Sequence, residues 1–273
     1  MQDNLRNVLI DLNLSGVKVE LNENVSVIED GRGQREETII TTTPSAYASL
    51  RRDTPSPAKG TIEHGAQAKG TIEPIIPKSE PVAMGELIEK ATEIARACDD
   101  IESLVREIRA FNGFPTAKLA KNMVAPKIGS NSDVLIVIDA VSLSDDAAGE
   151  VLTGEEGELF NKMMAAIGLS GPSVFPIINH RLPGGRGAST DEAAVMHIFF
   201  SRFLELSGAR RILTFGQGAL SFVVPDGGDL PKVHGQVIEV GALRVVATFG
   251  LKFLLGKPEF KKDAWGDLQV FKE

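Results

Sequence analysis

The sequence is poor in cysteine, in aromatic residues and in long apolar runs. Cys98 is the only cysteine in 273 residues, which excludes a disulfide framework and any site built from several thiolates. With thirteen Phe, one Trp and one Tyr, surfaces that could stack nucleobases are scarce. No apolar run approaches the roughly 18 residues that span a membrane, and the first residues carry charge throughout, unlike a signal peptide. We therefore expect no membrane association and a cytoplasmic location.

The chain also lacks an excess of basic residues. Lys and Arg number 29 against 37 Asp and Glu, which gives a formal net charge of −8. Bulk charge therefore does not favour general nucleic-acid binding, although a local basic patch remains possible. The sequence contains no GxSxG, Walker or HExxH motif, so it gives no direct sign of a serine hydrolase, a nucleotide triphosphatase or a zinc protease.

The first 83 residues differ in composition from the rest. Residues 1–21 hold apolar residues at helical spacing and predict a short amphipathic helix. Residues 22–83 are rich in Thr, Pro, Gly and charge, which predicts a disordered linker. AKGTIE occurs at 58–63 and again at 68–73. We interpret this pair as a duplication in an unconstrained linker, and the alternative is a short linear motif presented twice.

Residues 84–273 show the pattern of an α/β domain. Two amphipathic helices come first, with Asp99 and Asp100 between them as N-cap candidates. Near-continuous apolar runs, typical of strands covered on both faces, then alternate with helical segments. The runs are Val134–Ile138, Val174–Ile178, Arg211–Phe215 and Leu243–Thr248, and the helices are Gly157–Ile167, Thr190–Leu206, Gln217–Val223 and Pro258–Val270.

This alternation predicts a three-layer α/β/α fold with a central, four-stranded, mainly parallel sheet. Ligands bind such sheets at the carboxyl ends of the strands. The informative loops are therefore expected to begin at Asp139, Asn179, Gly216 and Phe249.

Five segments of residues 108–273 are collinear with motifs of one enzyme family. They are VLIVIDAVSLSDDAAGEVLTGEEGELFNKMMAAIGL, FNGFPTAK, RLPGGR, ILTFGQGA and ATFGLKFLLGKPEFKKDAWGDL. Together they resemble the uracil-DNA glycosylase superfamily, most closely its iron–sulfur type. The resemblance implies an enzyme that extrudes uracil from DNA and cleaves its glycosidic bond. Its site would contain a carboxylate, a hydrogen-bond donor to the departing base, a stacking aromatic ring and an amide that reads the base edge.

The positions that the resemblance assigns to this chemistry are degenerate. Asp139 falls on the family's catalytic glutamate, and the alternative is a capping or surface aspartate at a strand end. Gly250 replaces the histidine that donates to the departing base, and Leu152 replaces the stacking aromatic residue. The amide reader falls on Asn179, with Pro176 as the competing alignment because the loop before Arg181 is shortened.

The family's iron–sulfur cluster has no ligands in this chain. Phe114 and Met196 fall on two of the cluster cysteines, and His180 sits where another often lies. One thiol cannot replace four, so we predict no cofactor or metal and expect Phe114 and Met196 to be ordinary core. His180 is the one imidazole that could enter the cleft, although a solvated loop histidine is the simpler interpretation.

Charge around the expected DNA entrance is unfavourable. Between Lys127 and Lys162 there is no Lys or Arg, while eight carboxylates occur: Asp133, Asp139, Asp145, Asp146, Glu150, Glu155, Glu156 and Glu158. An acidic rim repels phosphates, so we expect weak nucleic-acid affinity there. Arg181 and Arg186, in a Gly-rich loop, remain candidates for holding a phosphate or another anion.

These features favour a catalytically degenerate, glycosylase-like protein that acts as a binding or interaction module. Its partner would be DNA or a protein of DNA repair or replication. The alternative is a divergent, active DNA glycosylase that cleaves uracil or another altered base, with Asp139 as the carboxylate and His180 or Asn179 as the donor. A third possibility is a cleft for a small ligand or nucleotide.

Overall fold

The computed structural model describes residues 84–273. The helix predicted for residues 1–21 and the linker predicted for residues 22–83 lie outside the described residues. No helix within 84–273 combines the length and the apolar character needed to cross a membrane.

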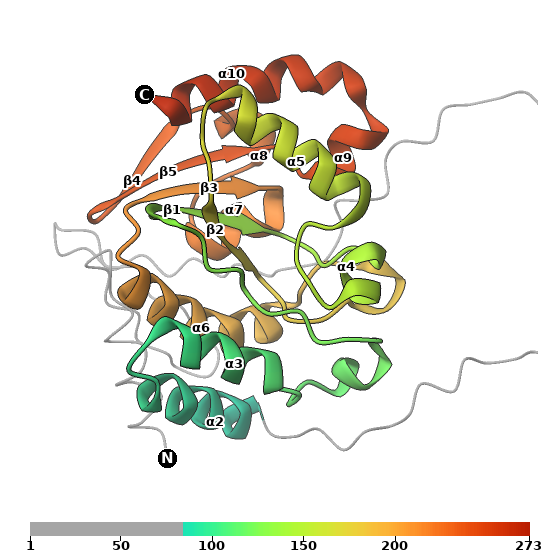
Figure 1. Ribbon diagram of the computed structural model, residues 1–273, viewed down its shortest axis with the longest axis vertical. Coiled ribbons are helices and arrows are strands. Elements are labelled where there is room, and N and C mark those ends of the chain that lie inside the picture. Colours follow the sequence, from blue (N-terminus) through green and yellow to red (C-terminus); the bar gives the residue numbers. More distant parts are fainter. Residues whose placement is uncertain (1–83) are drawn as a thin grey trace, which may run out of the picture. The chain divides into compact units, whose positions relative to one another are not determined.

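Five strands form one sheet in the order β2-β1-β3-β5-β4 (Figure 1). The strands are β1 Asn131–Ile138, β2 Pro172–Pro176, β3 Arg211–Phe215, β4 Val237–Val240 and β5 Leu243–Thr248. β1, β2, β3 and β5 pair in parallel, which confirms the mainly parallel α/β prediction. The four-strand count is corrected by β4, which adds an antiparallel edge strand beside β5. β4 is short and alternates exposed and half-buried residues, so it lacks the continuous apolar run that marks the central strands.

Helices cover both faces of the sheet and make three layers (Figure 1). They are α2 Met84–Ala97, α3 Ile101–Ala110, α4 Leu143–Ala148, α5 Gly154–Ala166, α6 Thr190–Ser207, α7 Gln217–Val223, α8 Leu230–Val233, α9 Leu251–Gly256 and α10 Lys261–Lys272, with short 3-10 turns η1 Pro115–Leu119, η2 Pro183–Gly185 and η3 Pro258–Phe260. On one face, Phe175 of β2 packs edge-on against Phe200 and Phe203 of α6. On the other, Phe215 of β3 packs against Phe160 of α5.

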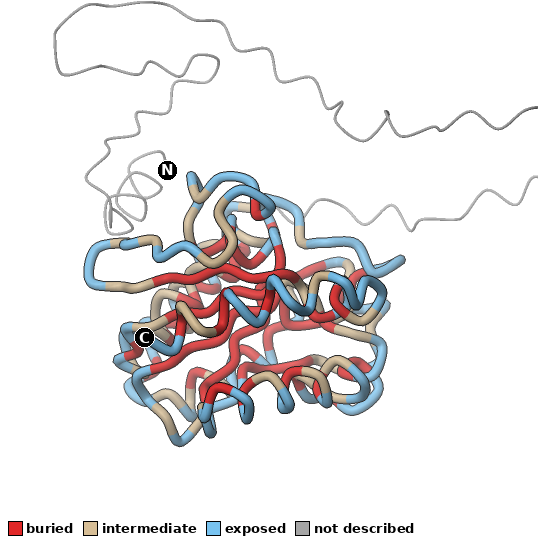
Figure 2. The backbone as a smooth tube through the Cα atoms, turned by 90° about the horizontal axis from the view of Figure 1, so that it is seen from above, coloured by how far each residue is buried: buried red, intermediate tan, exposed pale blue. Residues whose placement is uncertain are grey.

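The core follows the apolar runs of the strands. Buried residues lie along the sheet and the inner sides of the helices (Figure 2). Phe114 and Met196 are buried, as expected of core residues. Trp265 of α10 is 46% exposed, because its side of the helix faces away from the sheet while Leu268 and Phe271 are buried.

Helix starts follow their capping residues. Asp100 caps α3 by accepting from the backbone N–H of Ser103 at 2.6 Å, and Ser189 forms a capping box with Glu192 at the start of α6. A second capping box, formed by Ser142 and Asp145, starts α4. Helix α4 was not expected from the sequence, because six residues are too few to show a helical apolar period.

Candidate functional site

The carboxyl ends of the parallel strands meet at one edge of the sheet. Ile138 of β1 is in register with Pro176 of β2 and Phe215 of β3, and Phe215 is in register with Thr248 of β5. The loops that follow these residues therefore lie next to one another. The loop after β2 begins at Ile177, two residues before the expected start at Asn179, because β2 ends at Pro176.

Asp139 stands at this edge, directly after β1, against the backbone of the neighbouring β3 loop. Gly216 has φ 98°, and a Cβ there would lie 2.5 Å from Asp139 Cγ. A Cβ on Gly218, in the first turn of α7, would lie 3.1 Å from Asp139 Cβ and 3.4 Å from Ile177 Cδ1. Gly216 is thus required for the β3 loop to approach the carboxylate this closely, and a Cβ at Gly218 would fit tightly beside Asp139.

The β5 loop brings Gly250 to the same carboxylate. A Cβ on Gly250 would lie 3.7 Å from Asp139 Oδ2, 3.9 Å from Oδ1 and 3.6 Å from the Cα of Gly216. These are ordinary van der Waals separations, and Gly250 has φ −60° and ψ 145°, which any residue adopts. Position 250 therefore has room for a Cβ beside Asp139, and the chain supplies none.

Electrostatics at Asp139 favour its neutral form. Burial is the main cause, and the negative charge of Glu156 adds to it, so the pKa of Asp139 is raised to about 6. The pKa of Glu156, in the first turn of α5, is also raised, by burial and then by Asp145. The ammonium of Lys252, in the first turn of α9, lowers both pKa values in part. The carboxylates of Asp139 and Glu156 and the exposed ammonium of Lys252 thus act on one another at this edge of the sheet.

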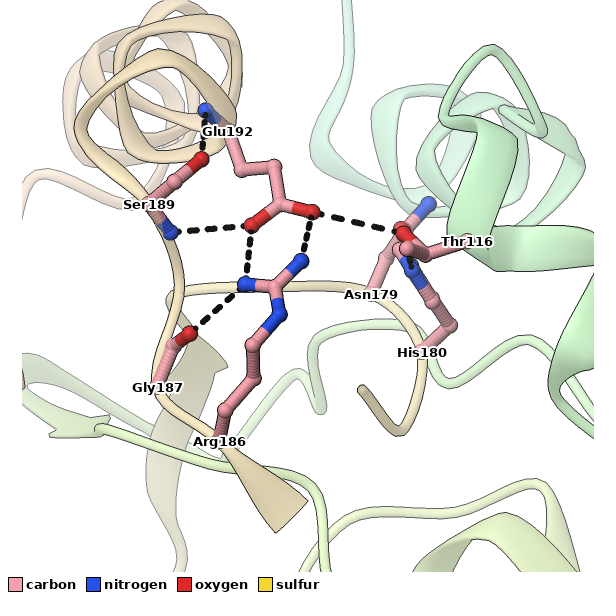
Figure 3. Close-up of polar contacts among 7 residues, drawn as sticks. All are labelled: Thr116, Asn179, His180, Arg186, Gly187, Ser189 and Glu192. Atoms are coloured by element: carbon pink, nitrogen blue, oxygen red, sulfur yellow. Dashed lines mark hydrogen bonds and ion pairs between the residues drawn. The ribbon is translucent and has the colours of Figure 1, made fainter. Parts of the chain in front are cut away.

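Asn179 and His180 do not join Asp139. The Asn179 amide nitrogen donates to the carbonyl oxygens of Ile108 at 2.9 Å and Phe111 at 2.8 Å. Its oxygen therefore accepts from His180 Nδ1 at 3.1 Å, and His180 Nε2 forms a hydrogen bond of 2.8 Å with the Thr116 hydroxyl, which also lies 3.3 Å from Glu192 Oε1. Both residues are fully buried, and burial lowers the pKa of His180 to about 4. The interpretation of His180 as a solvated loop histidine is therefore wrong: its ring is buried between Asn179 and Thr116 (Figure 3). Both side chains form hydrogen bonds within the protein, with partners in the α3–η1 segment.

Pro176, the alternative position for the amide reader, lies in the strand rather than in the loop. It ends β2 beside Ile138, the residue that precedes Asp139. A proline side chain has no hydrogen-bonding group. The β2 side of this edge is therefore apolar, with Pro176 and Ile177 both buried.

Arg186 is bound within the protein. Its guanidinium donates to both oxygens of Glu192, at 2.7 and 2.8 Å, and to the carbonyl of Gly187 at 2.8 Å (Figure 3). The guanidinium and the Ser189 backbone N–H hold the pKa of Glu192 at about 2 despite its burial. Arg181 and Arg186 were the two arginines predicted to hold an anion. The guanidinium of Arg186 is already paired with Glu192. Arg181 remains half-exposed, and its Nη2 and the Nζ of Lys252 would each lie 3.8 Å from a Cβ on Gly185.

Leu152 lies in the loop between α4 and α5 with a positive φ of 58°, which is unusual for a residue with a branched side chain. The Asp145 carboxylate fixes this loop by accepting from the backbone N–H and the hydroxyl of Thr153, at 2.7 and 2.8 Å. Leu152 lines a hollow of about 280 Å³ together with Lys127, Phe160, Asn161 and Val174 among others.

The acidic rim is smaller than the sequence suggests. Asp145 and Asp146 are buried, and both act as hydrogen-bond acceptors inside the protein. Asp146 accepts from the backbone N–H groups of Lys121 and Asn122, at 2.9 and 3.1 Å. The prediction of a fully exposed acidic face is corrected accordingly, although Glu150, Glu155 and Glu158 remain exposed.

Sequence reasoning missed Lys252 and the structural role of Gly216. Lys252 comes two residues after Gly250, so its place at the start of α9 was a usable signal. In the GQG turn at 216–218, the group that packs against both glycines is Asp139.

The corner holding Phe114, Met196 and His180 does not fit an iron–sulfur cluster, because two of these side chains are apolar and the third is occupied by Thr116 and Asn179. Among residues 84–273, no three His, Cys, Asp or Glu side chains are grouped so as to hold a metal ion. A comparison with protein-family models finds no family that matches this chain.

Proposed function

We propose that this protein is a catalytically degenerate relative of the uracil-DNA glycosylases that acts as a binding or interaction module for DNA or for a protein of DNA repair or replication. The observation that carries the proposal is the pairing of Asp139 with Gly250. The two positions that the resemblance assigns to the carboxylate and the imidazole lie within van der Waals range, but the second has no side chain.

The missing imidazole bears on the chemistry directly. Cleavage of the glycosidic bond leaves a base anion, which needs a hydrogen-bond donor in place before the bond breaks. Loss of one such donor costs about 10²- to 10³-fold in rate. Glycine at position 250 supplies no side-chain donor, and Asn179 and His180 are occupied elsewhere.

The carboxylate itself is retained at position 139. Burial and Glu156 raise the pKa of Asp139 to about 6, which leaves most of the population ionised at neutral pH. The loss of the donor at position 250 therefore carries the argument against catalysis.

A divergent, active glycosylase is the second candidate. Lys252 favours it, because its ammonium is exposed and close enough to Asp139 and Glu156 to lower both pKa values. In this version, Asp139 is the carboxylate and Lys252 replaces the donor that His180 and Asn179 do not provide. The acceptable substrates would be uracil or another altered base.

An abasic-site assay separates the two candidates. Oligonucleotides containing uracil or other modified bases are incubated with the wild-type protein, with Asp139→Asn, with Lys252→Met and with Asp133→Asn as a control at the exposed start of β1. We expect no cleavage above background by any of them. Cleavage that disappears in Asp139→Asn and persists in Asp133→Asn would overturn the proposal and establish the second candidate.

The binding half of the proposal has its own measurement. Affinity for single- and double-stranded oligonucleotides is measured over a series of salt concentrations, because binding through phosphates weakens steeply as salt rises. We expect weak, salt-sensitive binding that is reduced by Arg181→Ala. If no oligonucleotide binds even at low salt, DNA is excluded as the partner, and the proposed partner is then a protein.

A further inference from the structure

The hollow lined by Leu152 is a second candidate site, separate from the carboxyl edge of the sheet. Its volume is about 280 Å³, which is about that of nine water molecules in the liquid. Neither Asp139 nor Gly250 is among the described residues that line it. A space of this size admits a small organic molecule of about nine or ten non-hydrogen atoms.

The inner wall of the hollow is apolar. Phe160 of α5 and Val174 of β2 line it and are buried in the core. Pro172, the first residue of β2, is also buried and also lines it. A ligand that places hydrocarbon against this wall removes apolar surface from water on both sides, which favours binding.

One side of the hollow is held in place by the rest of the protein. Leu152 keeps its positive φ of 58° because the next residue, Thr153, is bound twice by the Asp145 carboxylate. The carbonyl of Leu152 also packs directly on α5, since a Cβ on Gly157 would overlap its oxygen. Backbone strain that the surroundings maintain in this way is common at binding sites, and the wall needs no rearrangement to receive a ligand.

The opposite side carries a positive charge at its outer end. The backbone of Lys127 is fixed beside β2, where its N–H and its carbonyl both form hydrogen bonds of 2.9 Å with Val174. Its side chain lines the hollow, is exposed, and forms no ion pair with a carboxylate among residues 84–273. Among the described residues of the lining, none is Asp or Glu. The ammonium of Lys127 is therefore the charge that a ligand in the hollow would meet.

Two neutral donors complete the outer rim. Ser130 precedes β1 and Asn161 lies on α5, and both line the hollow as exposed residues. A hydroxyl and a side-chain amide each donate hydrogen bonds to an oxygen acceptor. The hollow thus has an apolar interior and a rim that combines one cation with two hydrogen-bond donors.

We propose that this hollow binds a small monocarboxylate with an apolar body. The carboxylate lies at the rim, where it accepts from Lys127, Asn161 and Ser130, and the hydrocarbon lies against Phe160, Leu152 and Val174. The site is independent of the proposed function, because it shares no lining residue with the edge at Asp139.

Charge and shape favour a monocarboxylate over other anions. A single ammonium balances a single negative charge, and Glu155 and Glu158 are exposed on the same helix as Asn161, which disfavours an anion of higher charge such as phosphate. Phosphate also has no apolar part to place against the inner wall. An aromatic and an aliphatic body are the two sources of hydrocarbon, and they are distinguished by the choice of probe.

The test is an NMR titration of the isotope-labelled full chain with benzoate, hexanoate, benzamide and inorganic phosphate. We expect saturable shifts of the backbone amides of Ser130, Leu152 and Asn161 with benzoate, hexanoate or both, with a dissociation constant of about 1 mM or tighter. Benzamide has the shape of benzoate without its charge and should bind about three- to fivefold more weakly, the effect of an exposed ion pair. Phosphate should cause no saturable shift of these amides.

Lys127→Met tests the charge at the rim. It keeps the length of the side chain and removes the ammonium, so benzoate should bind about three- to fivefold more weakly while benzamide is unaffected. Lys121→Met is the matched control, because Lys121 is exposed and lies outside the lining. That control should bind benzoate as the wild type does.

Asn161→Trp tests the space itself. Its indole would fill the hollow from an exposed helix position, so binding of both carboxylates should be lost while circular dichroism and thermal unfolding show a folded protein. Ala166→Trp, at the exposed last residue of α5 and outside the lining, should leave binding unchanged.

Four results would each overturn the inference: no saturable shift with either carboxylate, benzamide bound as tightly as benzoate, phosphate bound as tightly as the carboxylates, or unchanged binding in both Lys127→Met and Asn161→Trp. Binding of benzoate alone identifies an aromatic body, and binding of hexanoate alone identifies an aliphatic one. The abasic-site and oligonucleotide measurements report on the proposed function separately, since none of these variants changes a residue at the Asp139 edge.

Discussion

Gly216 packs so closely against Asp139 that a Cβ at position 216 would lie 2.5 Å from Cγ of the aspartate and overlap its carboxylate. Gly216 also has a φ of 98°, a backbone conformation that residues other than glycine rarely adopt. The β3 loop therefore fixes the position of the carboxylate, because any residue larger than glycine would displace one of the two.

Gly216→Ala is expected to destabilise the protein more than glycine replacement at an open position. Gly208 has a φ of 68° with no atom near its Cβ position, so Gly208→Ala carries only the backbone cost of about 1 kcal/mol. Gly216→Ala should cost a further 1–3 kcal/mol, on the order of other overpacking changes. Urea unfolding of the two variants measures the difference. Adding Asp139→Ala to Gly216→Ala should recover part of the loss, and equal costs for both glycines would contradict the close contact.

Gly250→His should restore the missing donor without disturbing the fold. The Cβ position is free and the backbone angles suit any residue, so we expect the free energy of unfolding to change by about 0.5 kcal/mol or less. Because one donor is worth about 10²- to 10³-fold, uracil excision should rise at least tenfold above the wild-type background. The double variant with Asp139→Asn should lose this gain. A folded Gly250→His protein with unchanged background would contradict the assignment of these two positions.

Arg186→Ala should destabilise the corner shown in Figure 3. Removal of the guanidinium leaves the Glu192 carboxylate 10% exposed without its main partner, and after allowing for the 44% exposure of Arg186 we expect a loss of about 2 kcal/mol. Lys232→Ala is the matched control, because Lys232 and Asp229 form an ion pair of the same 2.7 Å length with both side chains exposed. That control should change stability by less than about 0.5 kcal/mol. If both variants lost a similar free energy of unfolding, the burial of Glu192 would not be what makes the Arg186 pair important.

Acid should affect His180 and Asp139 in opposite directions. The folded pKa of His180, about 4, lies below its ordinary 6.5, so the unfolded chain binds more protons and stability falls as the pH drops from 6.5 to 4. The folded pKa of Asp139, about 6, lies above its ordinary 3.8, so the folded chain binds more protons and stability rises as the pH drops from 6 to 4. In the wild-type protein the two contributions partly cancel.

Asp139→Asn should therefore make the protein more sensitive to acid. The variant keeps the loss due to His180 and lacks the opposing gain, so the free energy of unfolding should fall more steeply between pH 6 and pH 4 than in the wild type. Urea unfolding across this range measures the slopes, with Asp133→Asn expected to follow the wild type. A slope in Asp139→Asn equal to or shallower than that of the wild type would show that Asp139 is not protonated preferentially in the folded state.

The order of strands and helices, the buried faces of β1, β2, β3 and β5, and the Ser189–Glu192 capping box could all be derived from the sequence, because each depends on residues within one turn or one strand. The same local logic placed Asp139 at a strand end, where parallel strands gather their loops. The capping box of α4 and the short edge strand β4 were missed because their patterns are too brief to stand out.

Only the tertiary structure decided which side chains share the cleft. Asn179 and His180 come right after a buried apolar run, but their partners lie about 60 to 70 residues away in α3 and η1, and no local pattern records such a contact. The same holds for the contact of Gly216 and Gly250 with Asp139, which depends on the parallel register of three strands. Sequence patterns determine local conformation through the chain's own neighbours, whereas the orientation of a polar side chain depends on which distant donors and acceptors the packing brings within hydrogen-bonding distance.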